Sequence, residues 1–146
     1  MQNNFTFSAR LLGLAGLLPQ LLCLAALFDD NTRFIALGAG FLYAALILSF
    51  LGGFWWGLAV ASPGAPQWVY GIAVVPSLVA LASGIPWMIG STWPGPSLVL
   101  LGIALIAALW IDVRLNRLNI MPDWMLRLRI LLSTGLGLAT LALAAF

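Results

Sequence analysis

The sequence predicts an all-α protein that crosses a lipid bilayer five times, and three observations support this fold class. Of the 146 residues, 63% are hydrophobic and only 7% are charged, a balance that cannot supply the polar surface of a water-soluble domain. Residues 34–111 contain no charged side chain, and this run is far longer than the ~20 residues of one crossing. Clusters of proline and glycine divide the run at intervals that suit membrane-spanning helices. We therefore expect a single transmembrane helical domain over residues 1–146.

Breaker residues define the helices from the N-terminus onwards. The first predicted helix ends at a polar corner that begins with Asp29 and ends with Arg33. Breaks at residues 62–67 and 90–96, both rich in proline and glycine, divide the uncharged run into three helices. A last helix begins after Pro122. The five predicted helices cover residues 11–28, 34–61, 68–89, 97–113 and 123–146.

The arginines predict the orientation of these helices. Five crossings place the two termini on opposite sides, and five of the six arginines then fall on the side of the N-terminus. Positively charged residues that flank membrane spans are retained in the cytoplasm. We therefore expect a multi-pass protein of the bacterial inner membrane, with its N-terminus in the cytoplasm. The arginines on that side are Arg10, Arg114, Arg117, Arg127 and Arg129, and only Arg33 lies on the other.

Small residues recur at every fourth position of the second predicted helix. Such a stripe lets another helix approach closely, and close van der Waals contact is a main source of helix association in lipid. The stripe predicts a helix-packing seam, either inside this chain or with another subunit. Its members are Ala45, Ser49, Gly53, Gly57 and Ala61.

Two prolines indicate a candidate polar or ligand site. Pro19 and Pro76 lie near the middle of the first and third predicted helices, where a proline removes a backbone hydrogen bond and kinks the helix. Each is followed by a polar residue, Gln20 or Ser77. These side chains are expected either to satisfy the freed backbone or to bind a ligand between helices.

Trp55 and Trp56 are further candidates for this site. They directly follow two glycines, and adjacent side chains on a helix point in different directions. We expect one indole to pack inside and the other to meet lipid headgroups, with the indole N–H bonded to a polar partner. A flat hydrophobic molecule such as a quinone is the alternative partner for these rings.

The charged residues around the junction between the fourth and fifth predicted helices form the only charged cluster in the sequence. Their alternation with leucines predicts an amphipathic extension of the fourth helix on the cytoplasmic surface. Asp123 is expected to cap the fifth helix. Asp112 is expected to pair with Arg127 or Arg129, because a charge at such depth needs a partner. We interpret the cluster mainly as an orientation signal, and as a lipid-phosphate site only in second place. Its members are Asp112, Arg114, Arg117, Asp123, Arg127 and Arg129.

The composition argues against several functions. The chain has no His, Lys or Glu and only one Cys, so it lacks the residues for His-based catalysis, a zinc cluster or imidazole ligation of haem. We therefore predict no enzymatic activity and no cofactor. The few scattered arginines disfavour nucleic-acid binding. Proton-coupled transport usually needs a carboxylate inside the membrane, and residues 11–28 and 34–111 contain none.

Four stretches resemble a family of small bacterial and mitochondrial inner-membrane proteins whose animal member is called transmembrane protein 69. Residues 43–59 resemble the signature of its second helix, and residues 12–19 and 75–78 resemble parts of its first and third helices. Residues 122–124, together with 128–129, resemble the start of its fifth helix. The resemblance implies five helices in an inner membrane. It implies no catalytic or binding site, since the family has no established reaction.

Two hypotheses for the function follow. The first is a non-catalytic inner-membrane protein that acts as an accessory subunit or assembly factor of a larger, bioenergetic membrane complex. Its partners are membrane lipids and other membrane proteins. The alternative is a small transporter or a lipid- or quinone-binding protein that uses the kinks at Pro19 and Pro76, and a cavity beside Gln20 and Ser77 would favour it.

Overall fold

The described part of the chain is built from helices alone. The computed structural model describes residues 2–146, with side chains from Phe7 onwards. The helices are α1 (Gln2–Ala15), α2 (Leu18–Ala26), α3 (Arg33–Ala61), α4 (Trp68–Ser83), α5 (Ile85–Met88), α6 (Gly95–Arg117) and α7 (Asp123–Leu143).

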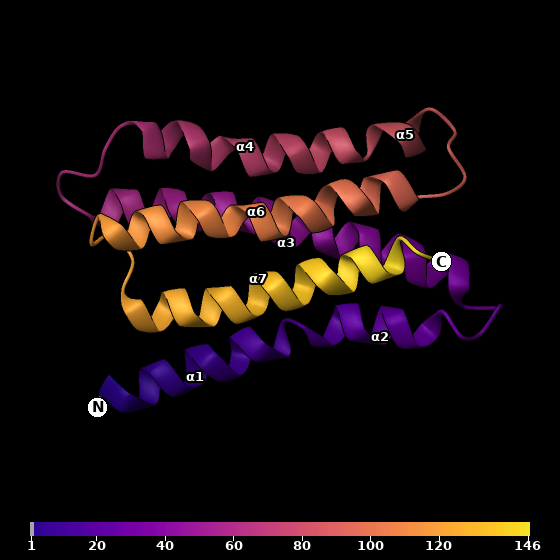
Figure 1. Cartoon of the computed structure of the whole chain (residues 1–146), viewed down its shortest axis with the longest axis horizontal. Helices are drawn as coiled ribbons and strands as arrows, with labels where there is room; N and C mark the ends of the chain where they lie inside the picture. Colours follow the sequence, from indigo (N-terminus) through magenta and orange to yellow (C-terminus); the bar gives the residue numbers. More distant parts are fainter. Residues whose placement is uncertain (1) are drawn as a thin grey trace.

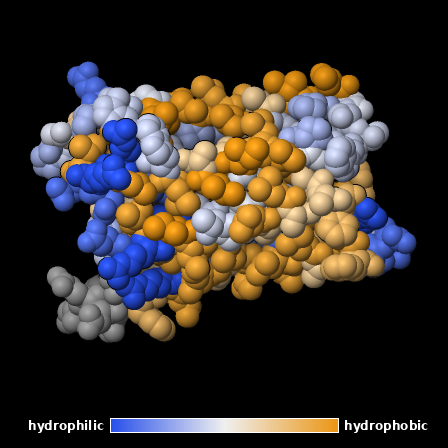
Figure 2. Space-filling view, in the orientation of Figure 1, coloured by the Kyte–Doolittle hydropathy of each residue, from blue (hydrophilic) through white to orange (hydrophobic). Residues whose placement is uncertain are grey.

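Five segments of the described residues are long and apolar enough to cross a bilayer, as predicted. The first combines α1 with α2, the third combines α4 with α5, and α3, α6 and α7 each form one alone. Hydrophobic side chains cover the middle of the molecule, and hydrophilic ones gather towards its two ends (Figure 2). The chain therefore has the architecture of a multi-pass membrane protein.

Helix α3 lies at the centre of the bundle. It packs against α2, α4, α6 and α7, and its inner face buries Leu48 and Leu51. Helix α6 contributes Leu98, Leu101 and Leu105 to the same hydrophobic core. Figure 1 shows α4 and α5 along one edge of the bundle and α1 and α2 along the opposite edge.

The charged residues are distributed unequally between the two ends of the bundle. The N-terminus, the α3–α4 loop and the α6–α7 loop lie at one end, which we call the N-terminal end (Figure 1). The C-terminus and the other two loops between spans lie at the opposite, C-terminal end. There Arg33 donates a hydrogen bond to the carbonyl of Phe146. The other five arginines belong to the segments of α1, α6 and α7 near the N-terminal end.

Glycines bring neighbouring helices into close contact at two places. Gly52 of α3 lies so close to α4 that a Cβ atom at this position would overlap the carbonyl oxygen of Ala73. Between α6 and α7, a Cβ atom at Gly102 or Gly137 would lie 3.0 Å from the carbonyl oxygen of the other. Such contacts are typical of helix packing in lipid, where small residues let backbones approach.

Several helix ends differ from the prediction. Helix α1 begins before the predicted residue 11, and α2 ends at Ala26 rather than residue 28. Helix α6 continues to Arg117 rather than ending at residue 113. The predicted amphipathic extension is therefore the last turn of α6. Helix α7 ends at Leu143, three residues before the predicted end.

The two prolines have different effects on their helices. The first span is interrupted between α1 and α2, and Pro19 lies in the first turn of α2, where its missing N–H needs no helical partner. Pro76 lies inside α4, which continues to Ser83, so the third span is not interrupted there. Its interruption lies at Gly84 instead. Pro76 is buried where α4 packs against Gly52 of α3.

Candidate functional site

Asp112 of α6 is completely buried, and both of its carboxylate oxygens have partners. Trp55 of α3 donates its Nε1–H to Oδ1 over 2.8 Å. Arg129 of α7 donates its Nε–H to Oδ2 over 3.1 Å. The same guanidinium donates from Nη2 to the hydroxyl of Ser133 over 2.9 Å. These four side chains, which we call the Asp112 network, connect three membrane-spanning helices.

The network confirms the predicted ion pair of Asp112, and it confirms that one of the two adjacent tryptophans packs inside the bundle. Asp112 pairs with Arg129, one of the two arginines proposed for it. Trp55 is buried, with its indole N–H bonded to the carboxylate, whereas Trp56 is exposed and packs edge to face against Tyr70. The buried carboxylate is stabilised by an opposite charge and by two hydrogen bonds, as a charged group in a low-dielectric interior requires.

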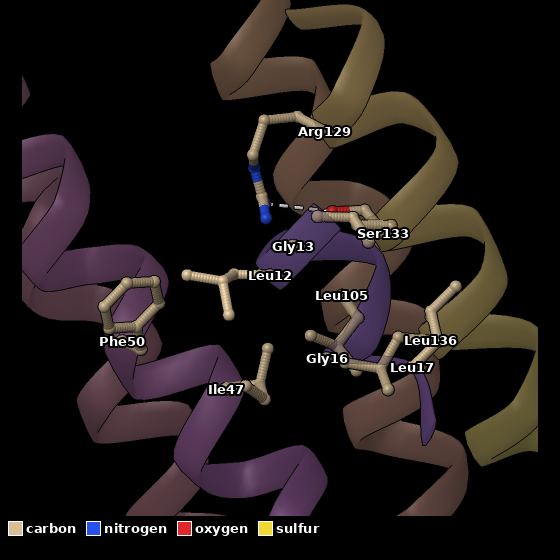
Figure 3. Close-up of a pocket in the computed structure, with 11 residues that line it drawn as sticks. Leu12, Gly13, Gly16, Leu17, Ile47, Phe50, Leu105, Arg129, Ser133 and Leu136 are labelled. Atoms are coloured by element: carbon tan, nitrogen blue, oxygen red, sulfur yellow. Dashed lines mark hydrogen bonds between the residues drawn. The ribbon is translucent and has the colours of Figure 1, made fainter. Parts of the chain in front are cut away.

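A cavity of about 300 Å³ lies directly beside Arg129 (Figure 3). Residues of α1, α3, α6 and α7 form its walls, and Arg129 and Ser133 are the polar side chains among them. Leu105, in its wall, is buried, whereas Leu12 and Phe50 are 70% and 66% exposed. The cavity therefore opens towards the lipid-facing surface of the bundle. We call it the Arg129 cavity.

The interruption between α1 and α2 forms part of this cavity. Gly16 and Leu17, the two residues between the helices, both line it. Tyr43 of α3 donates its hydroxyl hydrogen to the carbonyl of Gly16, so the interrupted backbone is tied to the central helix. Non-helical backbone at membrane depth is tolerated where protein covers it or where it borders a cavity.

Gln20 anchors α2 to the rest of the bundle. The side chain is fully buried, and its Nε2 donates to the Thr140 hydroxyl over 2.9 Å and to the Gly40 carbonyl over 3.3 Å. Its Oε1 has no hydrogen-bond partner among the described residues. Ser77 is exposed and shares a 2.9 Å hydrogen bond with Ser49. The structure therefore does not bring Gln20 and Ser77 together, and neither lines the Arg129 cavity.

The predicted small-residue seam packs inside the chain only at one end. Ala45 is buried and Ser49 is partly buried, but Gly53, Gly57 and Ala61 are exposed. Apart from the nearby backbone of α3 itself, no atom of the described residues lies within 4 Å of the position that a Cβ would take at Gly53 or Gly57. An internal seam is therefore not formed along this half of α3. The close contact inside the chain is made one position earlier, at Gly52.

The other members of the predicted charged cluster lie nearer the N-terminal end than the Asp112 network does. Arg114 stacks over the ring of Trp110, with its guanidinium carbon 4.8 Å from the ring centroid. Asp123 begins α7 as predicted, but the start of this helix has no side-chain cap. The Asp123 carboxylate instead accepts a 2.8 Å hydrogen bond from Asn116, because the turn between α6 and α7 brings these residues together. Arg117 and Arg127 are exposed.

Sequence reasoning missed three polar residues of these networks. Ser133 follows Arg129 by four positions, a spacing that places both on one helix face, so a signal for this contact was present. Tyr43 and Thr140 gave no such signal, because their partners Gly16 and Gln20 are distant in the sequence.

Comparison with known proteins identifies the family. No curated protein and no solved structure matches the chain. A family model described as "Protein of unknown function (DUF3429)" matches residues 6–145. The match includes all five candidate membrane spans and agrees with the resemblance seen in the sequence. The chain therefore belongs to this family of proteins of unknown function.

Proposed function

We propose that the protein is a non-catalytic inner-membrane protein that binds another membrane protein, as an accessory subunit or assembly factor of a larger complex. The observation that carries this proposal is the outward-facing half of the small-residue stripe. Gly53, Gly57 and Ala61 lie on one side of α3 and are exposed. We call these three residues the outer stripe.

The two glycines of the outer stripe pack against no other helix of the described structure. Glycine in a helix interior is about 1 kcal/mol less favourable than alanine, and no described atom beyond the local backbone of α3 lies within 4 Å of a Cβ position at Gly53 or Gly57. The glycines inside the bundle, such as Gly52, are in close contact with a neighbouring helix. A helix from a partner would give the outer stripe the same close packing.

The polar chemistry of the chain supports a non-catalytic role. Hydrolytic and acyl-transfer reactions need an activated nucleophile and a base, and the chain has no His, Lys or Glu to serve as that base. The chain has aspartates, but the buried one, Asp112, uses both carboxylate oxygens in contacts with Trp55 and Arg129. The Asp112 network therefore acts in this proposal as a connection between helices.

The orientation in the membrane is part of the same proposal. Five arginines are associated with the N-terminal end of the bundle and one with the C-terminal end. By the positive-inside rule, the N-terminal end lies in the cytoplasm. The resemblance of the sequence to inner-membrane proteins supports a bacterial inner membrane as its location.

Native mass spectrometry of the full-length protein, purified from its own membrane in a mild detergent, tests the partner. We expect a hetero-complex for the unmodified protein and its loss in Gly57→Leu, because a leucine would fill the outer stripe. Gly71→Leu is the matched control, since Gly71 is also an exposed helical glycine with no atom within 4 Å, but lies on α4. A complex that survives both Gly57→Leu and Gly53→Leu, or a protein that is monomeric throughout, contradicts the proposal.

A further inference from the structure

We propose that the Arg129 cavity binds a neutral, lipid-soluble molecule through a carbonyl oxygen, with the Arg129 guanidinium and the Ser133 hydroxyl as hydrogen-bond donors. The inference concerns a small-molecule ligand and does not depend on the protein partner proposed above. The sequence alone suggested a ligand site at Gln20, Ser77, Trp55 and Trp56, and none of these four residues lines the Arg129 cavity.

The guanidinium has unused donors beside the cavity. An arginine side chain carries five N–H groups. In Arg129, Nε–H binds Asp112 and one Nη2–H binds Ser133, and the three others have no partner among the described residues. The side chain is only 11% exposed. Donors that face an apolar cavity without an acceptor are costly in a low-dielectric environment, and an acceptor oxygen in the cavity would satisfy them.

The charge balance of the site selects a neutral acceptor. Asp112 is completely buried and forms an ion pair with Arg129, so the two charges cancel beside the cavity. A phosphate or an ionised carboxylate would bring an extra charge into a site where no further cation balances it, which is unfavourable at membrane depth. A carbonyl oxygen accepts hydrogen bonds from the guanidinium without adding charge.

The shape of the cavity fits an amphipathic molecule that arrives from the membrane. Apart from Arg129 and Ser133 its lining side chains are apolar. Its volume of about 300 Å³ lies at the lower end of the ~300–1,000 Å³ of small-molecule sites. It therefore holds a headgroup while the tail stays in lipid, and the exposed Leu12 and Phe50 mark the side of entry. Interrupted helices border ligand sites in many membrane proteins, and Gly16 and Leu17 do so here.

Quinones and neutral lipids both combine a carbonyl group with an apolar tail, and a binding experiment with one probe of each kind shows which of them the cavity accepts. The probes are decylubiquinone, a neutral quinone with an alkyl tail, and dioleoylglycerol, a neutral lipid with ester carbonyls. Decylbenzene, which has a tail and a ring but no carbonyl, is the negative control. We expect at least one carbonyl probe to raise the unfolding temperature of the full-length protein in dodecyl maltoside, and decylbenzene to have no such effect. The probe that binds identifies the source of the ligand.

Two pairs of variants locate the binding. Ile47→Trp fills the cavity and should abolish the shift, whereas Leu46→Trp changes the neighbouring, lipid-exposed position and should preserve it. Arg129→Lys keeps a cation beside Asp112 but removes the planar group of donors. It should weaken binding by about tenfold, as expected for the loss of one hydrogen bond. Arg127→Lys, at an exposed arginine outside this cavity, is its control.

Clear outcomes contradict the inference. It fails if neither carbonyl probe binds the unmodified protein, or if decylbenzene binds as tightly as they do. It also fails if Ile47→Trp binds the probes as well as Leu46→Trp. Should Arg129→Lys not fold, the comparison of Ile47→Trp with Leu46→Trp decides the question without it.

Discussion

At the scale of single residues, Asp112 and Arg129 form an ion pair in the interior of the bundle. Asp112 is 0% exposed and the Arg129 side chain 11%, so water contributes little to either charge. Each group makes the burial of the other tolerable, and Trp55 supplies the third bond. The pair therefore links α6 to α7, and loss of either partner would leave the other charge buried without a counter-charge.

Removing one partner should be far more damaging than removing both. Arg129→Met leaves a buried, unpaired carboxylate, and we expect it to lower the free energy of unfolding by about 3–5 kcal/mol. The double variant Asp112→Leu/Arg129→Met replaces the pair by apolar groups and should lie much closer to the unmodified protein. Unfolding in mixed micelles by circular dichroism measures both. Arg127→Met, at an exposed position, is the control, with an expected change within about 0.5 kcal/mol. Equal losses in the single and double variants would contradict this account.

The residues of the candidate site were predictable to the extent that electrostatics alone selects them. A carboxylate at the end of an apolar helix needs a cation, which restricted the partner of Asp112 to the nearby arginines. The bond from Trp55 was not predictable, because it depends on how α3 is rotated about its axis. The Arg129 cavity was missed for the same reason, since its walls come from four helices that no local pattern relates.

At the scale of elements, Pro19 and Pro76 show how tertiary contacts decide the effect of a local breaker. A proline lacks the N–H that a helix interior uses for its hydrogen-bond ladder. Pro19 lies in the first turn of α2, just after the division of the first span, where the Tyr43 hydroxyl donates to the Gly16 carbonyl. Pro76 is held against α3, and α4 continues. The five spans were predictable from composition and breaker clusters, whereas their ends and interruptions depend on such contacts.

The same substitution should affect stability very differently at the two adjacent glycines of α3, Gly52 and Gly53. Gly52→Leu places a side chain against the backbone of α4, and we expect a loss of about 3 kcal/mol in the free energy of unfolding, at the upper end of typical overpacking effects. Gly53→Leu points into open space, so it should change the stability of the isolated protein by no more than about 0.5 kcal/mol. Unfolding of the purified proteins in the same mixed micelles measures the difference. Similar losses of stability in the two variants would contradict an arrangement in which Gly52 faces α4 and Gly53 faces away from it.

At the scale of the whole molecule, the charges divide the bundle into two unlike ends, and this asymmetry predicts its orientation. Five arginines accompany the N-terminal end, where the α3–α4 and α6–α7 loops also lie. The hydrophilic residues in Figure 2 are correspondingly more abundant at that end. No single helix carries this information, because it depends on the number of crossings that separate the arginines.

Reporter fusions therefore test the fold and the orientation together. A reporter that is active only in the cytoplasm should work when fused after residue 65 or 119, and one active only outside should work after residue 92 or 146. Five crossings require this alternation, and the positive-inside rule determines its direction. Replacing Arg114, Arg117 and Arg127 by Gln reduces the bias from five arginines against one to two against one, so part of the molecules should insert the other way round. A C-terminus that is cytoplasmic in the unmodified protein would contradict the orientation. The same location in the unmodified and the triple variant would show that something other than arginine sets it.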